Sequence, residues 1–269
     1  MDTVALDKNN LRARVDALLD GMIERFYQVA PLGGYQKDAA EIDLNYFVRH
    51  SIETVLRIRH KRMIDALVIH YFTKHNPRLA KAWANYTEDE MLHGHMFARD
   101  LQKLAGLTIE EIYQQYEPLF STKLLNGYFY FTLEHEGPMA AITSAYFLEY
   151  TTRKTQPVWL DNLERVFGKE NLMGARGHVN HDIRDNHNDF VWDVLAALIN
   201  NEEDEARFFM HLNHIYGLFV AYFQDVYQQT LASNDQAGIE KITLLAVKEA
   251  NHLRAVTGKP VYEYAGNAS

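Results

Sequence analysis

Apolar residues recur every three or four positions along most of this chain, a spacing that predicts α-helices and leaves little room for strands. In the segment 6–30, for example, one face carries Leu11, Val15, Leu18, Met22 and Phe26. Prolines and glycines fall mainly where the periodic segments begin or end. We expect helices over about 6–30, 39–72, 77–106, 109–116, 121–136, 138–154, 158–167, 171–199, 204–231 and 236–257. The pattern predicts one all-α domain over 1–258 and a loosely held tail over 259–269.

Composition excludes several classes of protein. The chain has 269 residues and no cysteine, so disulfides, thiolate catalysis and cysteine-ligated metals are excluded. A formal net charge of −9 without a basic run argues against a nucleic-acid partner. The start of the chain does not resemble a signal peptide, and no stretch is apolar enough to suggest a membrane span. A cytoplasmic protein without a membrane partner is therefore expected.

The helix expected over 77–106 carries a Glu-x-x-His pair on its apolar face. Glu90 and His93 lie three residues apart, which brings their side chains to one side of a helix. Such a pair on an inward face is the arrangement with which helical bundles hold a dinuclear metal centre. A structural hydrogen bond between Glu90 and His93 is the alternative interpretation.

The segment 178–189 combines three histidines and three aspartates directly before an apolar helical stretch. Extending the apolar stripe backwards places His181 and Asp185 on the inner face in the best register. The alternative register places His178, Asp182 and Asp185 there. The alternative interpretation without a metal is that the first half of the helix is solvent-exposed, with acidic residues near its start.

A third helix carries a single carboxylate, Glu149, after an aromatic and aliphatic run. A surface pair with Arg153, four residues later, would also account for it. Taken together, Glu90, His93, Glu149, His181 and Asp185 supply nitrogen and oxygen ligands from three separate helices. This donor set suits a non-haem iron or manganese site inside a bundle.

The order and spacing of these residues resemble the haem-oxygenase-like diiron oxidases, whose fold is shared with the TenA-like proteins. In that family one helix supplies a His with a nearby Glu, a later helix supplies a Glu, and a third supplies His-x-x-x-Asp-x-x-His. His93, Glu90 and Glu149 match the first two helices, and His181 with Asp185 matches the start of the last motif. The resemblance covers most of the chain and implies a haem-oxygenase-like helical bundle.

Two positions depart from the family pattern. Asn188 stands where the last motif ends in His, with His187 beside it. Either His187 reaches the metal through a local bulge, or one iron is held more weakly, or the ligands follow the His178 register. The first carboxylate of the family is also unassigned.

Three residues of the helix over 39–72 are candidates for that carboxylate position or its surroundings: Glu53, His60 and Asp65. Each has a structural alternative, since Glu53 can pair with Arg57, Asp65 can pair with Lys61, and His60 can be a core residue. Glu53 and Asp65 rank equally.

The resemblance implies an enzyme with two iron ions, of which the second can be weakly bound, or with manganese. Such an enzyme uses dioxygen and an external reductant to oxidise a small organic molecule, by N-oxygenation, C–C cleavage or oxidative decarboxylation of an amino-acid-like or fatty-acid-like substrate. A homodimer is a family-level expectation. An enzyme of the same fold without a diiron centre and a non-enzymatic helical interaction protein are the alternatives.

Aromatic side chains that cluster before Glu149 suggest a substrate pocket, with Tyr130 and Tyr146 as its candidates. Plain core packing is the alternative interpretation of the same aromatic residues.

Overall fold

The computed structural model describes residues 7–30 and 33–232, and every regular element in them is a helix. The elements are α1 (Lys8–Val29), α2 (Tyr35–Asp38), α3 (Leu44–His75), α4 (Pro77–Glu90), α5 (His93–Ala105), α6 (Ile109–Gln115), α7 (Phe120–His135), α8 (Met139–Phe167), a 3₁₀ turn (Lys169–Asn171), α9 (Met173–Asp185), α10 (His187–Ala196) and α11 (Glu202–Thr230). The predicted all-α class is confirmed. The helix expected over 236–257 and the tail over 259–269 lie outside the described residues.

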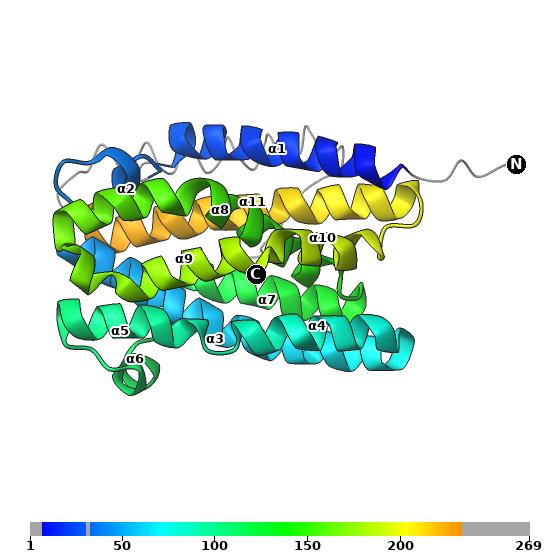
Figure 1. The fold of residues 1–269 in the computed structure, drawn as a ribbon, viewed down its shortest axis with the longest axis horizontal. Helices are drawn as coiled ribbons and strands as arrows, with labels where there is room; N and C mark the ends of the chain where they lie inside the picture. The colour runs from blue at the N-terminus through cyan, green and yellow to red at the C-terminus, as the bar shows by residue number, and fades with distance from the viewer. Residues whose placement is uncertain (1–6, 31–32, 233–269) are drawn as a thin grey trace, which may run out of the picture.

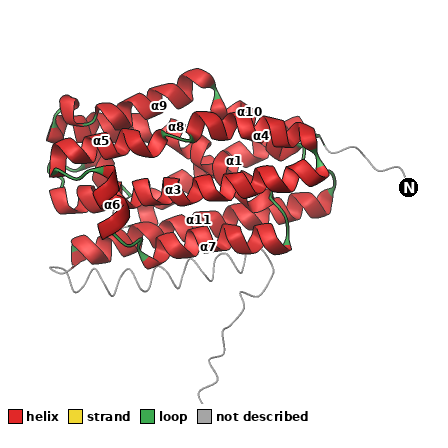
Figure 2. Cartoon of the chain, turned by 90° about the horizontal axis from the view of Figure 1, so that it is seen from below, coloured by secondary structure: helices red, strands yellow, loops and turns green. Residues whose placement is uncertain are grey.

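The helices form an elongated bundle in which most axes run along the long dimension of the molecule (Figure 1). Two pairs of shorter helices, α4 with α5 and α9 with α10, each lie end to end along one side of it. Helix α9 packs on α5 and α10 packs on α4, while α8 contacts both α9 and α10. Seen from below, α7 and α11 lie beside each other and α6 crosses the bundle (Figure 2).

Helix starts follow the capping residues of the sequence. Thr108 and Glu111 form a capping box at α6, and Pro77 occupies the first turn of α4. Two further starts are capped by buried carboxylates from other helices. Glu53 of α3 accepts from the backbone N–H of Leu119 at the start of α7, and Asp100 of α5 accepts from two N–H groups at the start of α9. These carboxylates satisfy donors that a helix end leaves unpaired.

Helix α8 is longer than the sequence predicts. The expected break between 138–154 and 158–167 does not occur, because Pro157 lies inside a continuous helix. Pro157 cannot donate to the carbonyl of Arg153, but Arg153 is exposed, so water can take the place of that donor. Trp159, Leu160 and Leu163 just beyond it are buried in the core, which favours continuing the helix over ending it.

Two helices expected to be continuous are instead broken. The helix over 77–106 is interrupted at Met91 and Leu92, and the helix over 171–199 is interrupted at Asn186. Asn186 has a left-handed backbone, with φ 55° and ψ 40°, the one non-glycine residue of positive φ in the described chain. Neither break contains proline or glycine. In the described residues, no helix is long and apolar enough to cross a bilayer.

Candidate metal centre

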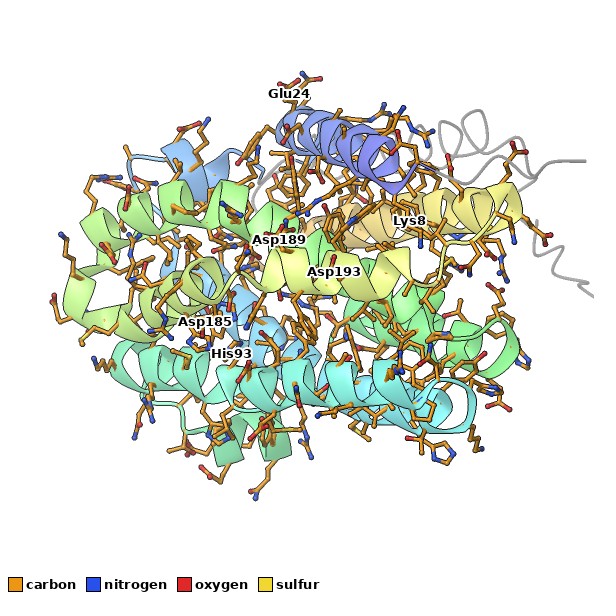
Figure 3. All side chains as sticks on the ribbon, turned by 45° about the vertical axis from the view of Figure 1, so that its right-hand side comes forward. Lys8, Glu24, His93, Asp185, Asp189 and Asp193 are labelled. Atoms are coloured by element: carbon orange, nitrogen blue, oxygen red, sulfur yellow. The ribbon has the colours of Figure 1, made fainter. Side chains whose placement is uncertain are left out.

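The two helix breaks lie side by side and bring histidine and carboxylate groups together between them. Glu90 is the last residue of α4 and His93 the first of α5, so the turn between them turns both side chains inward. The Nδ1 atom of His93 lies 3.1 Å from Oε2 of Glu90. Figure 3 shows His93 on the side of α5 that faces the end of α9.

The left-handed turn at Asn186 brings His187 to the same place. Its Nδ1 atom lies 3.2 Å from Oε1 of Glu90 and 3.8 Å from Oδ1 of Asp182. His187 is 4% exposed although its neighbour Asp185 is exposed. Along a continuous helix each side chain points about 100° away from the preceding one. The left-handed residue at 186 interrupts this progression, so His187 points in a direction that an unbroken helix would not give it.

Glu149 reaches the cluster from the middle of α8. It is 8% exposed, and the hydroxyl of Tyr86 donates to its Oε1 atom over 2.7 Å. Burial and the nearby negative charge of Glu90 raise the pKa of Glu149 to about 7. Tyr86 is a partner that the sequence analysis did not single out. It lies four residues before Glu90 and hence on the same helical face, which is the signal that could have identified it.

The donor groups form two triads that share one residue. The first consists of Glu90, His93 and His178, and the second of Glu90, Glu149 and His187. Within each triad the available ligand atoms lie within 4.8 Å of one another. Four of the five residues are buried, and His178 is partly buried. A carboxylate common to two sets of ligands is the arrangement expected of a bridging ligand in a dinuclear site.

Of the alternative register, His178 and Asp182 face inward and its third member, Asp185, is exposed. His178 and Asp182 line the interior, and Nδ1 of His178 lies 3.2 Å from Oδ2 of Asp182. His181 and Asp185 lie at the outer edge of α9. Asp185 is exposed and pairs with Arg184, and His181 contacts the same arginine through Nδ1 at 2.9 Å.

His181 and Asp185 still form a third triad with His187, at the rim of the site. The structure thus brings Glu90, His93, Glu149, His178 and His187 together in the interior and leaves the pair favoured from sequence at its edge. The physical reason is the break at Asn186, since the apolar stripe of α10 does not continue in phase into α9.

Two buried polar atoms of the cluster have no hydrogen-bond partner among the described residues: Oδ1 of Asp182 and Nε2 of His187. Buried groups of this kind are costly unless a partner satisfies them. A divalent cation would bind just these lone pairs, and imidazole with carboxylate is a donor set that suits iron or manganese. The residues therefore fit a metal centre.

The protonation states point the same way. Burial, together with the charges of Glu149 and Glu90, raises the pKa of Asp182 to about 9. Burial and the charge of His93 lower the pKa of His178 to about 3, whereas its hydrogen bond to Glu90 raises the pKa of His187 to about 9. The cluster holds more acidic groups than it can ionise together, a conflict that bound cations would relieve.

The two remaining carboxylate candidates occupy different surroundings. Asp65 is buried next to the cluster, where Lys61 donates to it and Nη1 of Arg62 lies 3.5 Å from both Asp65 and Glu90. Asp65 is thus separated from the triads by a cation.

Glu53 of α3 contacts the start of α7 and belongs to none of the triads. It pairs with Arg49 over 2.6 Å and accepts from Leu119 and Thr122. The expected pair of Glu53 with Arg57 does not form, whereas the pair of Asp65 with Lys61 does. His60 is half-buried and belongs to none of the triads.

A cavity of about 220 Å³ opens from the cluster into the bundle. Glu90, Glu149, His178 and Asp182 line one part of it, and mainly apolar side chains line the rest. Neither Tyr130 nor Tyr146 belongs to its walls.

Tyr130 lies on the outer face of α7, and Tyr146 is buried against Trp192 with its hydroxyl on Asp16. The neighbours Phe129 and Phe147 line the cavity instead. The aromatic run does contribute to the cavity, but through positions adjacent to those selected from sequence.

Comparison with known proteins identifies the fold. No family model and no curated protein matches the chain. A domain of unknown function with a heme oxygenase-like fold from Shewanella denitrificans OS217 superposes with a TM-score of 0.72 at 16% identity, covering 83% of this chain and 94% of that domain. A CADD-like protein of unknown function from Nostoc punctiforme PCC 73102 gives 0.62 at 13% identity, covering 84% and 99%. The chain has the heme oxygenase-like fold, as its sequence predicts.

Proposed function

We propose that this protein is a non-haem diiron oxidase or oxygenase that uses dioxygen to oxidise a small organic molecule. The observation that carries the proposal is the pair of triads that share Glu90 inside a bundle with the heme oxygenase-like fold. Tyr86 and Arg62 account for part of the charge of the two carboxylates, but Oδ1 of Asp182 and Nε2 of His187 are buried beside them without a hydrogen-bond partner, which a bound cation would relieve.

The chain's own residues would supply position, charge and protons. Glu90 lies between His93 and His187 and can hold one ion with each of its oxygens. Tyr86 fixes Oε1 of Glu149 and leaves the other oxygen for a ligand bond. Two bound iron ions would supply the electron transfer that the reduction of dioxygen needs, and an external reductant would return them to the ferrous state.

Arg62 would limit the negative charge of the site. Its Nη1 atom lies 3.5 Å from both Glu90 and Asp65, within a side chain that is itself mostly buried. Burial is outweighed by hydrogen bonds with His187 and His93, which lower the pKa of Glu90, and the fixed cation beside it adds to this effect, so that Glu90 stays ionised and ready to bind. The apolar walls of the cavity would hold the substrate and exclude bulk water.

Metal analysis tests the proposal. Full-length protein is loaded with ferrous iron under nitrogen, freed of excess metal and analysed for iron. About two ions per chain are expected, and exposure to air should produce a transient visible absorption. Manganese is loaded in parallel, since the donor set accepts it as well.

Two variants of α4 make this test specific. Glu90→Gln should lose both ions because Glu90 belongs to both triads, whereas Glu88→Gln changes an exposed residue two positions away and should retain them. Wild-type protein that binds no iron above the level of Glu90→Gln would overturn the proposal. The bundle would then favour acid–base chemistry at the Tyr86–Glu149 pair, the alternative without a metal.

A further inference from the structure

The lining of the cavity extends along α3. Its lining residues on that helix run from Phe47 to Arg62, fifteen residues apart, which corresponds to about 22 Å at the rise of an α-helix. Arg62 lies at the metal end, beside Glu90. Aromatic side chains line the other end, among them Phe26, Phe47 and Trp159.

Three cationic side chains line this cavity: Arg57, Lys61 and Arg62. Lys61 is paired with Asp65, and Arg62 lies between Asp65 and Glu90. Arg57 forms no ion pair with any residue that the structure describes. The nearest candidate by sequence, Glu53, is already bound by Arg49, by the backbone of Leu119 and by Thr122.

Arg57 is held at a fixed place in the cavity wall. Its guanidinium carbon lies 5.3 Å from the ring centre of Phe219 and 5.1 Å from that of Tyr222, both on α11. Cation–π contacts orient a guanidinium and compensate part of its desolvation. Tyr222 is also its hydrogen-bond partner and Glu53 acts on it at longer range, but no carboxylate of the described residues lies within ion-pair distance of it. A half-buried cation in an otherwise mainly apolar cavity is stabilised most by an anion that enters with the ligand.

We propose that Arg57 binds the anionic group of the substrate, and hence that the substrate is an organic anion with an extended apolar body. This inference rests on the proposed function for the identity of the reacting end. The anion would sit on Arg57, five residues or about 7 Å along α3 from Arg62 at the metal end. The part of the molecule between the two would pass Ile58, Phe129 and Phe147, and either a carboxylate or a phosphate satisfies the guanidinium.

Ligand binding to metal-free, full-length protein tests this proposal. The probes are decanoate, decyl phosphate and decan-1-ol, which share one apolar chain and differ in the charge of the head group. Binding is followed by isothermal titration calorimetry, with the intrinsic tryptophan fluorescence, to which the cavity-lining Trp159 contributes, as a second signal. Wild-type protein should bind at least one of the two anions ten times or more tightly than the alcohol, and the anion preferred identifies carboxylate or phosphate as the natural group.

Variants on α3 assign the effect to Arg57. Arg57→Gln should bring the affinity for the anion down to that for the alcohol, and Arg57→Lys should retain part of the preference. Arg59→Gln is the matched control, because Arg59 is exposed on the same helix, stacks on Tyr113 and lies outside the cavity lining. Circular dichroism verifies that each variant is folded.

Two results would overturn the proposal: no preference for either anion in the wild type, or a preference that Arg57→Gln leaves intact. Iron content is measured on the same variants. Retained iron with lost anion preference in Arg57→Gln separates anion binding from metal binding. Absent iron in a wild type that still prefers anions would contradict the diiron function alone.

Discussion

One left-handed residue decides which histidine reaches the interior. Asn186 separates α9 from α10, and His187 directly follows it. Glycine tolerates this conformation and asparagine often adopts it, whereas it costs a β-branched residue about 1–2 kcal/mol of conformational free energy. We therefore expect Asn186→Gly to keep both stability and iron content, and Asn186→Val to lose about 1–2 kcal/mol of unfolding free energy. Urea denaturation and iron analysis measure both effects, and an unchanged Asn186→Val protein would refute this role.

The histidines of α9 should differ in their effect on metal binding. His178 belongs to a triad with Glu90 and His93, while His181 lies at the rim on Arg184. We expect His178→Ala to reduce the iron content markedly and His181→Ala to reduce it less. This order reverses the one that the favoured sequence register implies. Iron analysis after anaerobic loading decides, and greater loss in His181→Ala would restore the sequence register.

Which carboxylate has which partner could not be predicted at the scale of single residues. Glu53 and Asp65 have the same local surroundings in sequence, with a cation four residues away in each case. Only the packing of α7 against α3 gives Glu53 the donors of Leu119 and Thr122. Glu90, His93 and Glu149 were selected correctly as neighbours because helical spacing and apolar surroundings fix the face on which a residue lies.

At the scale of helices, periodicity predicted their existence and approximate bounds but not where they break. The turn at Met91–Leu92 has no proline or glycine, and its two apolar side chains are exposed. At Pro157 the sequence predicts a break that does not occur. The helix continues because the residues that follow Pro157 are buried in the core. The break at Met91–Leu92 and the continuity at Pro157 both depend on contacts between distant helices, which no local pattern records.

The closest approach of two helices in this region depends on a glycine. A Cβ atom added to Gly174 of α9 would lie 1.9 Å from the carbonyl oxygen of Met96 on α5. Gly174→Ala should therefore displace α9 and cost about 1–3 kcal/mol of unfolding free energy, together with part of the iron content.

The matched control lies one turn further on. At Gly177 the same Cβ atom would be 3.1 Å from the flexible end of Met96, so that Gly177→Ala should be close to neutral. Thermal or urea denaturation compares the two variants. Equal stability of both would show that the bundle accommodates the extra carbon at Gly174 without cost.

For the whole molecule, buried histidines outside the metal cluster set a dependence of stability on pH. Burial lowers the pKa of His50 to about 3 and that of His211 to about 4, from 6.5. Both rings are neutral in the folded chain, whereas the unfolded chain takes up protons below pH 6.5. Stability is thus complete above that pH and declines as the pH falls, by about 1.4 kcal/mol per histidine at pH 5.5.

His211 of α11 offers the clearer test of this dependence, because it is 2% exposed, contacts Tyr128 of α7 and belongs to none of the triads. Urea denaturation at pH 7.0 and 5.5 should show a smaller loss for His211→Gln than for the wild type. His187, whose pKa is raised to about 9, acts in the opposite sense and loses its stabilising effect only between pH 6.5 and 9. An equal loss in both proteins at pH 5.5 would contradict the role of His211.

The breaks in α4–α5 and in α9–α10 lie at one level of the molecule, while α3, α8 and α11 pass that level without interruption. Helix ends leave backbone donors and acceptors outside the regular ladder, so this cross-section is a seam where local opening is cheapest. Amide hydrogens over 91–95 and 186–190 should exchange faster than those over 52–56, by mass spectrometry, and metal loading should slow them. Small molecules could then enter and leave through breathing of the seam while the three long helices hold the bundle together.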